Sequence, residues 1–236
     1  MKRGVAERLD ALGRRYGISA SGADQLARLL DALAAEPDPP TTVRAPEAAI
    51  DQHVADSLSA LDFEQLRSAS RVADIGSGAG FPGLPLAVAL PDARVHLVES
   101  VGRKCAVIER LAVAAQIANA RVLQVRAEDL AAGEGRRAYD VVTARAVGSL
   151  AVLVEYAAPL LREGGWFIAW KGARNPEEQA EGAAAAQLLG LDLTEVRRVV
   201  PYEGARNLNL YLYSKDRSTP NEFPRRPGLA AKRPLA

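Results

Sequence analysis

A glycine-rich run that follows an acid is the first feature of this sequence that suggests chemistry. Gly76, Gly78 and Gly80 come soon after an apolar stretch containing Asp74, and a helical pattern follows them. Glycines at such a turn let backbone N–H groups approach a ligand closely, because no side chain blocks the approach. The run therefore predicts a nucleotide-type ligand, although a tight strand-to-helix turn without a ligand has the same pattern.

Two cofactors fit this run. Residues 78–83 match Gly-x-Gly-x-x-Gly, and Glu99 follows at about the 20-residue spacing of a dinucleotide fingerprint. An NAD(P)-dependent oxidoreductase is therefore an alternative. However, the loop has two further residues before the match, and Pro82 starts a helix where a diphosphate-binding helix usually continues. These departures favour S-adenosylmethionine as the cofactor.

Polar residues after neighbouring strands support a cofactor site. The carboxyl ends of parallel strands line the crevice in which ligands bind. Glu99 is placed to accept hydrogen bonds from ribose hydroxyls, and Asp74 to meet the donor's ammonium group directly or through water. Ala127 and Glu128 follow the third strand, where a backbone amide and a small side chain suit an adenine edge. Each acid taken alone is also compatible with an ordinary surface position.

Arg145, at the end of the fourth expected strand, is the candidate for positioning donor and acceptor. Its guanidinium can pair with a phosphate or with an oxygen of a nucleobase. A salt bridge from Arg145 to Glu128 or Asp140 is the alternative. Cys105 is expected to be an inert core residue.

Alternating strand and helix patterns position these residues. We expect strands at 72–75, 94–98, 121–125, 139–143 and 166–170, then an antiparallel pair at 192–200 and 206–213. We expect helices between them at 80–90, 102–117, 149–161 and 176–189. The fold class is therefore α/β, a class I S-adenosylmethionine-dependent methyltransferase (Rossmann-like) with a seven-stranded sheet and a reversed last strand.

Three regions follow from the pattern. Residues 1–66 form an N-terminal helical cap with a long helix at about 46–61, and residues 67–215 form the methyltransferase domain. Residues 216–236 form a basic tail rich in Pro and Arg, in which we expect no regular helix. Cations outnumber acids in this tail, so it can lie along a phosphate backbone or remain a solvated end.

Composition limits the other possibilities. A length of 236 residues with 48% hydrophobic content suits one α/β domain with a small appendage, and the net charge is only +1. One cysteine excludes a disulfide framework and a cysteine-cluster metal site, so we expect no metal and a cytoplasmic location. The longest weakly polar run, residues 182–191, is too short to span a bilayer, so we expect no membrane role.

Several motifs resemble the bacterial small-subunit ribosomal RNA guanine-N7 methyltransferases, also called RsmG or GidB. The resemblance extends from about residue 40 to the end, and it rests on His53–Leu58, Asp74–Pro85 (DIGSGAGFPGLP), Glu99-Ser100, Arg126–Glu128, Ala144–Ala146, Lys171-Gly172 and Arg206–Leu210. One departure is Pro39-Pro40-Thr41, where the family often has Asn-Leu-Thr.

The resemblance implies that S-adenosylmethionine is the cofactor and that 7-methylguanosine in 16S ribosomal RNA is the product. For that product, the guanidinium of Arg145 can pair with guanine O6 and leave N7 free for the methyl group. Methylation of N7 needs no general base, since N7 already carries a lone pair, and alignment supplies the catalysis. The implied cofactor pocket contains Gly76, Phe81, Ala127, Glu128 and Arg145. The implied partner is 16S rRNA, within the small ribosomal subunit or an assembly intermediate, and the protein is expected to be a monomer. A non-catalytic RNA-binding protein with the same fold is a further alternative.

Candidate RNA contacts are mostly cations outside the cofactor motifs. His53 and Asp56 share one helix face, where they can close over the pocket, contact RNA or pair with each other in the core. Lys171 ends the fifth strand, and Trp166 and Trp170 alternate on the same face, which is typical of core residues. The remaining RNA-binding candidates are Arg206, Arg225, Arg226, Lys232 and Arg233.

Overall fold

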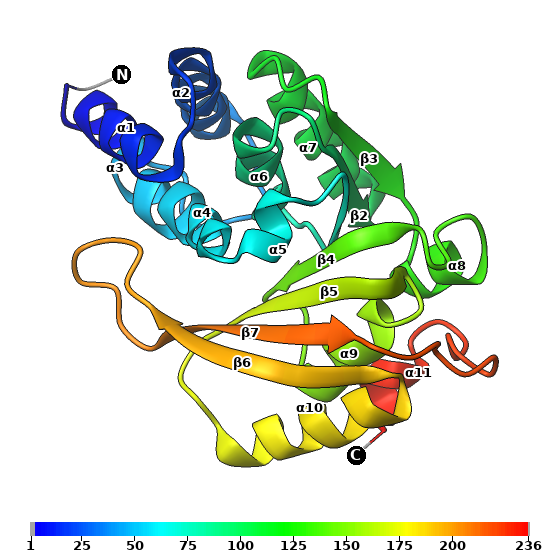
Figure 1. Ribbon diagram of the computed structural model, residues 1–236. Coiled ribbons are helices and arrows are strands. Elements are labelled where there is room, and N and C mark those ends of the chain that lie inside the picture. Colours follow the sequence, from blue (N-terminus) through cyan, green and yellow to red (C-terminus); the bar gives the residue numbers. More distant parts are fainter. Residues whose placement is uncertain (1–2, 236) are drawn as a thin grey trace.

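Seven strands form one twisted sheet at the centre of the computed structural model, which describes residues 3–235 (Figure 1). The strands are β1 (Arg71–Ile75), β2 (Arg94–Glu99), β3 (Ala120–Gln124), β4 (Tyr139–Arg145), β5 (Leu161–Lys171), β6 (Leu191–Val199) and β7 (Leu208–Lys215). Their order is β3-β2-β1-β4-β5-β7-β6, and β7 runs antiparallel to both of its neighbours. This arrangement confirms the predicted class I methyltransferase fold with its reversed last strand.

Helices cover both faces of the sheet because side chains alternate between the faces along each strand. Val72 lies in one apolar cluster with α1 (Arg3–Tyr16), α2 (Ala20–Ala35), α6 (Gly83–Ala89) and α7 (Gly102–Ala114). The next residue, Ala73, lies in the other cluster with α8 (Ala127–Ala132), α9 (Leu150–Ala157) and α10 (Pro176–Leu188). The N-terminal helices therefore share a core with the sheet, and the boundary at residue 66 remains a prediction.

The expected long helix at 46–61 is divided into segments of different pitch. These are α3 (Pro46–Ala49), a π-helical stretch (Ile50–Ala55), α4 (Asp56–Leu58) and a 3₁₀ turn (Ser59–Asp62), followed by α5 (Glu64–Arg67). π-Helical turns are rare and often occur at functional sites. Here the π-helical stretch contains His53, and the return to α-helical pitch begins at Asp56.

Three local predictions were wrong. The helix expected from Gly80 begins at Gly83, because Gly80 has a φ of 91°, outside the helical region. The last strand begins at Leu208 rather than Arg206, because Asn207 has a φ of 55° that is incompatible with a strand. The tail contains a short helix, α11 (Leu229–Lys232), which packs against α9. In addition, α8 was not predicted, since six residues are too few for a clear helical period.

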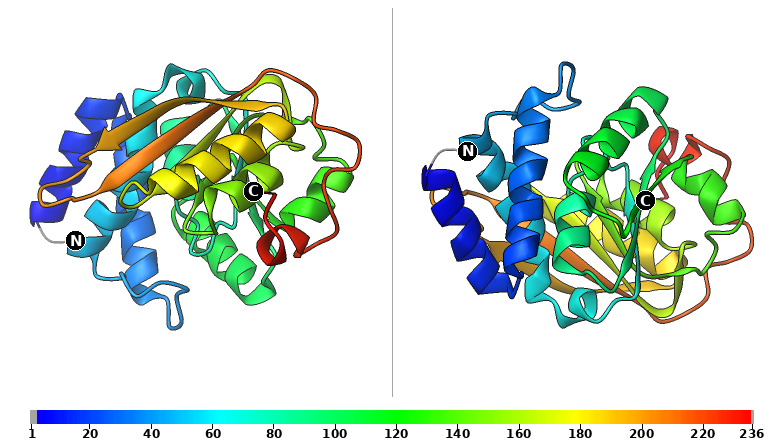
Figure 2. Two further views of the ribbon diagram at one scale, coloured as in Figure 1. Left: turned by 90° about the horizontal axis from the view of Figure 1, so that it is seen from below. Right: turned by 90° about the horizontal axis from the view of Figure 1, so that it is seen from above.

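The two chain ends that the structure describes lie on opposite sides of the molecule. The N-terminal helices and the C-terminal segment are separated by the sheet in both views of Figure 2. Within residues 3–235, no helix is both long and apolar enough to cross a membrane.

Candidate active site

The loop after β1 presents backbone at the carboxyl end of the sheet. Gly76 is exposed and has a φ of 68°, and a Cβ placed on it would lie 2.5 Å from Cγ2 of Val147. Only glycine tolerates both that conformation and that contact. The amide of Gly78 donates to Oε2 of Glu99 at 3.2 Å, so the loop is fastened to the end of β2.

Glu99 connects the glycine loop to the start of α7. Its other oxygen, Oε1, accepts from the amide of Val101 at 2.9 Å. Nζ of Lys104 lies 3.9 Å from Oε2. The residue is 6% exposed and lines a cavity of about 150 Å³ with Gly76 and Ala127. The structure therefore brings the predicted residues of β1, β2 and the segment after β3 to one cavity, at which the carboxylate of Glu99 is available to hydroxyl donors.

Asp74 is fully buried and does not line this cavity. Its Oδ2 accepts from the amide of Gly83 at 3.1 Å, and its Oδ1 accepts from the hydroxyl of Thr143 at 3.0 Å. Complete burial raises the pKa of this carboxyl to about 6, although these hydrogen bonds oppose the shift. The carboxyl thus holds the start of α6 and the middle of β4, and it does not face the cavity as the sequence suggested.

Ala127 and Glu128 are the first two residues of α8. Both border the cavity, and the buried carboxylate of Glu128 accepts from the amide of Gly228 at 2.8 Å. Gly228 belongs to the C-terminal segment, which the sequence predicted to be free of regular structure. Glu128 therefore joins this segment to the edge of the cavity, a contact that no sequence pattern indicated.

Arg145 ends β4 and lies in a cluster supplied by the N-terminal segment. Its Nη1 donates to Oδ2 of Asp56 at 2.8 Å and to the carbonyl of Gln52 at 3.1 Å. Neither of the expected alternative partners is used, because Glu128 binds Gly228 and Asp140 pairs with Arg162. The alternative salt bridge from Arg145 to Glu128 or Asp140 is therefore not formed.

His53 supports the other side of the guanidinium. Its Nε2 lies 2.9 Å from the carbonyl of Val43, which can only accept, so Nε2 carries the proton. Nδ1 is then free to accept from Nη2 of Arg145 at 3.4 Å. The ring also stacks on Phe81 with centroids 4.4 Å apart. Burial and the charge of Arg145 lower the pKa of His53 to about 4, so the ring is neutral at physiological pH.

A second cavity, of about 230 Å³, lies at the carboxyl ends of β4 and β5. Asp56, Arg145, Trp170 and Lys171 contribute to its lining. Trp170 is fixed there by a hydrogen bond of 3.0 Å from Nε1 to the carbonyl of Asp56. Within residues 3–235, the buried Oδ1 of Asp56 has no hydrogen-bond partner. Burial raises the pKa of Asp56, while Arg145 opposes the shift. An unpaired buried acceptor on a residue that lines a cavity suits a ligand with N–H groups.

The predicted RNA-binding cations fall into two groups. Lys171 pairs with Glu178 at 2.6 Å, and Arg225 donates through Nε to Glu155 at 2.6 Å, so the charges of both are compensated within the protein. The other four candidates are exposed, namely Arg206, Arg226, Lys232 and Arg233. The residues that the structure describes contain no group of three or more His, Cys, Asp or Glu side chains that could hold a metal ion.

The sheet order, the glycine loop after β1 and the acid that ends β2 define the class I S-adenosylmethionine-dependent methyltransferase fold. Solved structures agree on the fold. A SAM-dependent O-methyltransferase from Thermotoga maritima has a TM-score of 0.56 at 16% identity, covering 81% of this chain and 72% of that one. Aeropyrum pernix fibrillarin, solved with natively bound S-adenosyl-L-methionine, has a TM-score of 0.54 at 17% identity, covering 67% and 72%.

Sequence comparison narrows the class further. The family model described as rRNA small subunit methyltransferase G matches residues 38–208. The ribosomal RNA small subunit methyltransferase G of Rubrobacter xylanophilus is 43% identical, covering 81% of this chain and 75% of the relative. That of Desulfitobacterium hafniense is 38% identical, covering 83% and 81%. This chain belongs to the family of rRNA small subunit methyltransferase G, and the predicted family is confirmed.

Proposed function

We propose that this protein transfers the methyl group of S-adenosylmethionine to N7 of a specific guanine in small-subunit (16S) ribosomal RNA. The observation that carries the proposal is the position of the segment after β4. Arg145 and Ala146 line the cavity at the ends of β4 and β5, while Val147 lines the cavity beside the glycine loop. A donor and an acceptor in these two cavities would meet at this segment.

The cavity beside the glycine loop is the proposed donor site. Gly76 and Ala127 offer backbone there, and the carboxylate of Glu99 suits the ribose hydroxyls. Gly78 does not line this cavity, and its amide holds Glu99 in place. When bound, S-adenosylmethionine supplies a methyl group activated by a sulfonium. Ligand pockets usually exceed about 300 Å³, and this cavity is about 150 Å³. The segment carrying Val147, which covers Gly76, is therefore the part that we expect to move when the donor enters.

Three of the residues predicted from the sequence to bind the cofactor are given supporting roles. We assign Asp74 to holding the glycine loop, since its carboxylate is bonded to Gly83 and Thr143. We assign Glu128 to holding the C-terminal segment at the cavity edge. Phe81 supports His53 by stacking, and the guanidinium carbon of Arg145 lies 5.9 Å from the centroid of its ring. These side chains act on the site through their neighbours.

The second cavity is the proposed acceptor site, and its polar groups match guanine. The guanidinium of Arg145 can donate to O6, and the unpaired Oδ1 of Asp56 can accept from N1–H or the exocyclic amino group. These groups follow one another along the edge of guanine, so N7 remains free. Catalysis then consists of alignment, because N7 needs no deprotonation.

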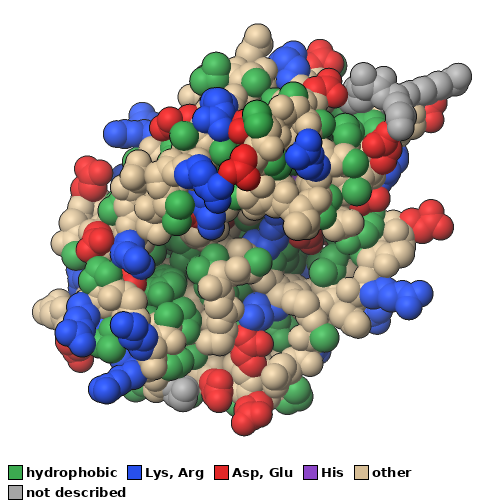
Figure 3. Space-filling view, turned by 180° about the vertical axis from the view of Figure 1, so that it is seen from behind, with side chains coloured by type: hydrophobic (Ala, Val, Ile, Leu, Met, Phe, Trp, Pro, Cys, Tyr) green, Lys and Arg blue, Asp and Glu red, His purple; other side chains and the backbone are tan. Residues whose placement is uncertain are grey.

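The wider substrate contacts are also proposals. Exposed Arg206, Arg226, Lys232 and Arg233 are suited to phosphates, whereas Lys171 and Arg225 are held in ion pairs. On the face seen in Figure 3, basic and acidic side chains are interspersed around a hollow. On this face, local basic positions, and not one broad surface, would therefore contact the RNA. We propose that a monomer acts in the cytoplasm on the small subunit or an assembly intermediate.

Methylation of small subunits from cells that lack the enzyme tests this function. Labelled S-adenosylmethionine should transfer one methyl group to one guanine, and chemical mapping should find it at N7. Label at another atom, or in no RNA, would contradict the proposal. Thermal unfolding distinguishes the methyltransferase from the oxidoreductase alternative. The true cofactor, at 100 times its Kd, should stabilise the folded protein by about 2.7 kcal/mol. NAD(P) should give no such shift.

A further inference from the structure

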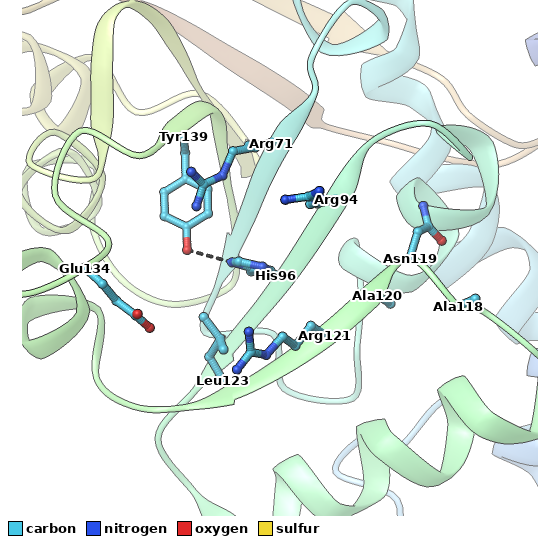
Figure 4. A pocket seen from close by; sticks show the side chains of 10 residues that line it. All are labelled: Arg71, Arg94, His96, Ala118, Asn119, Ala120, Arg121, Leu123, Glu134 and Tyr139. Atoms are coloured by element: carbon cyan, nitrogen blue, oxygen red, sulfur yellow. Dashed lines mark hydrogen bonds between the residues drawn. The ribbon is translucent and has the colours of Figure 1, made fainter.

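A strongly basic cavity lies at the opposite end of the sheet from the proposed active site (Figure 4). It has a volume of about 470 Å³, and its lining includes Arg71, Arg94, Arg121, His96 and Tyr139. Arg71 and Arg94 are the first residues of β1 and β2, whereas the glycine loop and Glu99 lie at the last residues of the same strands. The cavity is therefore distinct from the proposed donor and acceptor cavities.

Strand register gathers these side chains on one face. Arg71 is paired with Arg94, and His96 with Arg121, in adjacent parallel strands. Side chains at paired positions point to the same face of a sheet. The connection from β3 to β4 contains α8, which has only six residues and follows the carboxyl end of β3. The amino-terminal half of β2 and β3 consequently stays open, and the cavity occupies that space.

The cavity concentrates positive charge, and the protein places few acidic side chains beside it. No ion pair involves Arg71, Arg94 or Arg121 within residues 3–235, although paired like charges on adjacent strands are unfavourable. Glu134 is the acid among the lining residues, and Figure 4 shows its carboxylate apart from Arg94. Such an arrangement favours an anion that several guanidinium groups can share.

Two further groups give the cavity a fixed polar wall. The hydroxyl of Tyr139 lies 2.9 Å from Nδ1 of His96, which orients the imidazole. The Arg71 guanidinium lies over the Tyr139 ring, with its carbon 5.5 Å from the centroid. Tyr139 is itself 1% exposed, so this wall is part of the core. The arginines thus extend from an ordered base.

We propose that this cavity binds a phosphate group of the RNA substrate, outside the nucleotide that is methylated. The inference rests on the proposed function, because the RNA is taken to be the molecule that carries the phosphate. Arginine is the side chain best suited to phosphate, since its planar fork donates two hydrogen bonds to one group. Strands of five or six residues span about 17–20 Å, so the bound phosphate would lie at least that far from the acceptor cavity. The site would recognise the shape of a folded RNA segment and leave the choice of base to Arg145 and Asp56.

Charge-neutral and charge-conserving variants test the inference at the same three positions. The triple variant R71Q/R94Q/R121Q should bind small-subunit RNA at least tenfold more weakly than the wild type. The slope of log K against log salt should become shallower by about 0.7 for each phosphate of single-stranded RNA that is no longer neutralised. R71K/R94K/R121K keeps the charge and should keep most of the slope. Unchanged affinity and slope in the Gln variant would overturn the proposal.

Two controls keep this result separate from other failures. Affinity for S-adenosylmethionine should not change and thermal stability should not fall in either triple variant, since the mutated side chains are exposed and remote from the donor cavity. If wild-type protein fails to methylate small subunits, the proposed function fails; if it methylates them and the Gln variant does so equally well, only this inference fails.

The histidine signals identify the source of the phosphate. The chain has two histidines, so the His96 imidazole resonance can be assigned with a His53→Asn variant. RNA should shift the His96 signal in the wild type and not in R71Q/R94Q/R121Q. A shift with adenosine monophosphate or inorganic phosphate but none with RNA would contradict an RNA contact and indicate a free anion.

Discussion

Two arginine–carboxylate pairs join flanking segments to the sheet domain, and they differ in what they leave open. Arg145 binds Asp56 of the N-terminal segment, and Arg225 of the C-terminal segment binds Glu155. Both oxygens of Glu155 accept from Arg225, and that carboxylate side chain is only 3% exposed. Asp56, in contrast, uses one oxygen and leaves Oδ1 unpaired beside a cavity.

This difference separates a structural pair from a functional one. A carboxylate with all of its acceptors satisfied inside the protein stabilises the fold and has nothing left for a ligand. A carboxylate with one buried acceptor unused costs stability until a donor arrives. We therefore expect changes at Arg145 to reduce methyl transfer, and changes at Arg225 to reduce the free energy of unfolding.

The largest effect is expected for Arg145→Ala. Loss of the guanidinium removes the group that aligns guanine, so kcat/KM for methyl transfer should fall by about 10²- to 10³-fold. Circular dichroism should show that the fold persists. Arg225→Ala is the matched control and should keep most of the activity. Near-normal transfer by Arg145→Ala would refute its assignment.

The second effect is a pH dependence of stability that comes from His53 in the Arg145 cluster. His53 has a pKa of about 4 in the folded protein and an ordinary value of 6.5, so the folded state favours the neutral ring. Its contribution is fully present above pH 6.5 and is lost as the pH falls towards 4, by about 3 kcal/mol. Denaturant unfolding of the wild type should therefore weaken more steeply over this range than that of His53→Asn. Parallel curves would contradict the shift.

A smaller loss of stability is expected for Arg225→Ala. It leaves the Glu155 carboxylate buried without its partner, which costs about 2 kcal/mol after allowance for the partial exposure of Arg225. Urea unfolding measures the loss. The double variant Arg225→Met/Glu155→Leu should recover most of it, because no charge is then left buried. If the double variant is no more stable than Arg225→Ala, an unpaired charge is not the cause.

The smallest effect concerns the link between Glu128 and the C-terminal segment. Glu128→Ala removes the acceptor for the Gly228 amide, and the Kd for S-adenosylmethionine should rise severalfold, equivalent to about 1 kcal/mol. Calorimetric titration measures this change. Glu128→Gln keeps an acceptor oxygen and should bind nearly as well as the wild type. Equal losses in both variants would mean that the carboxylate charge, and not the hydrogen bond, matters.

Local patterns predicted much of the sheet and the glycine loop. Apolar runs identified the strands, and Gly76 and Glu99 were placed at one cavity because parallel strands end at the same edge. Position alone could not predict orientation. Asp74 lies near the end of β1, close to Gly76, but its carboxylate is buried and accepts hydrogen bonds from Thr143 and Gly83.

Contacts between distant segments could not be predicted. Asp56 and Arg145 are 89 residues apart, and no periodic pattern connects a helix of the N-terminal segment with the end of β4. The tail showed the same difficulty. Its composition suggested a solvated chain, but Phe223 is buried in the same apolar cluster as Ala73. The carbonyl of Phe223 also accepts a hydrogen bond from Arg136. A few apolar residues within a basic segment were enough to fix it.

The hydrogen bond between Glu128 and Gly228 also has a consequence for the order of events during synthesis. The two residues are 100 positions apart, so a ribosome makes the acceptor long before its donor. At about 5–20 residues per second, the interval is roughly 5–20 seconds. During that time the sheet around β1 to β4 can assemble, but Glu128, at the edge of the proposed donor cavity, lacks its partner in the C-terminal segment. A nascent chain would acquire full affinity for its methyl donor only after the C-terminal segment has emerged and docked.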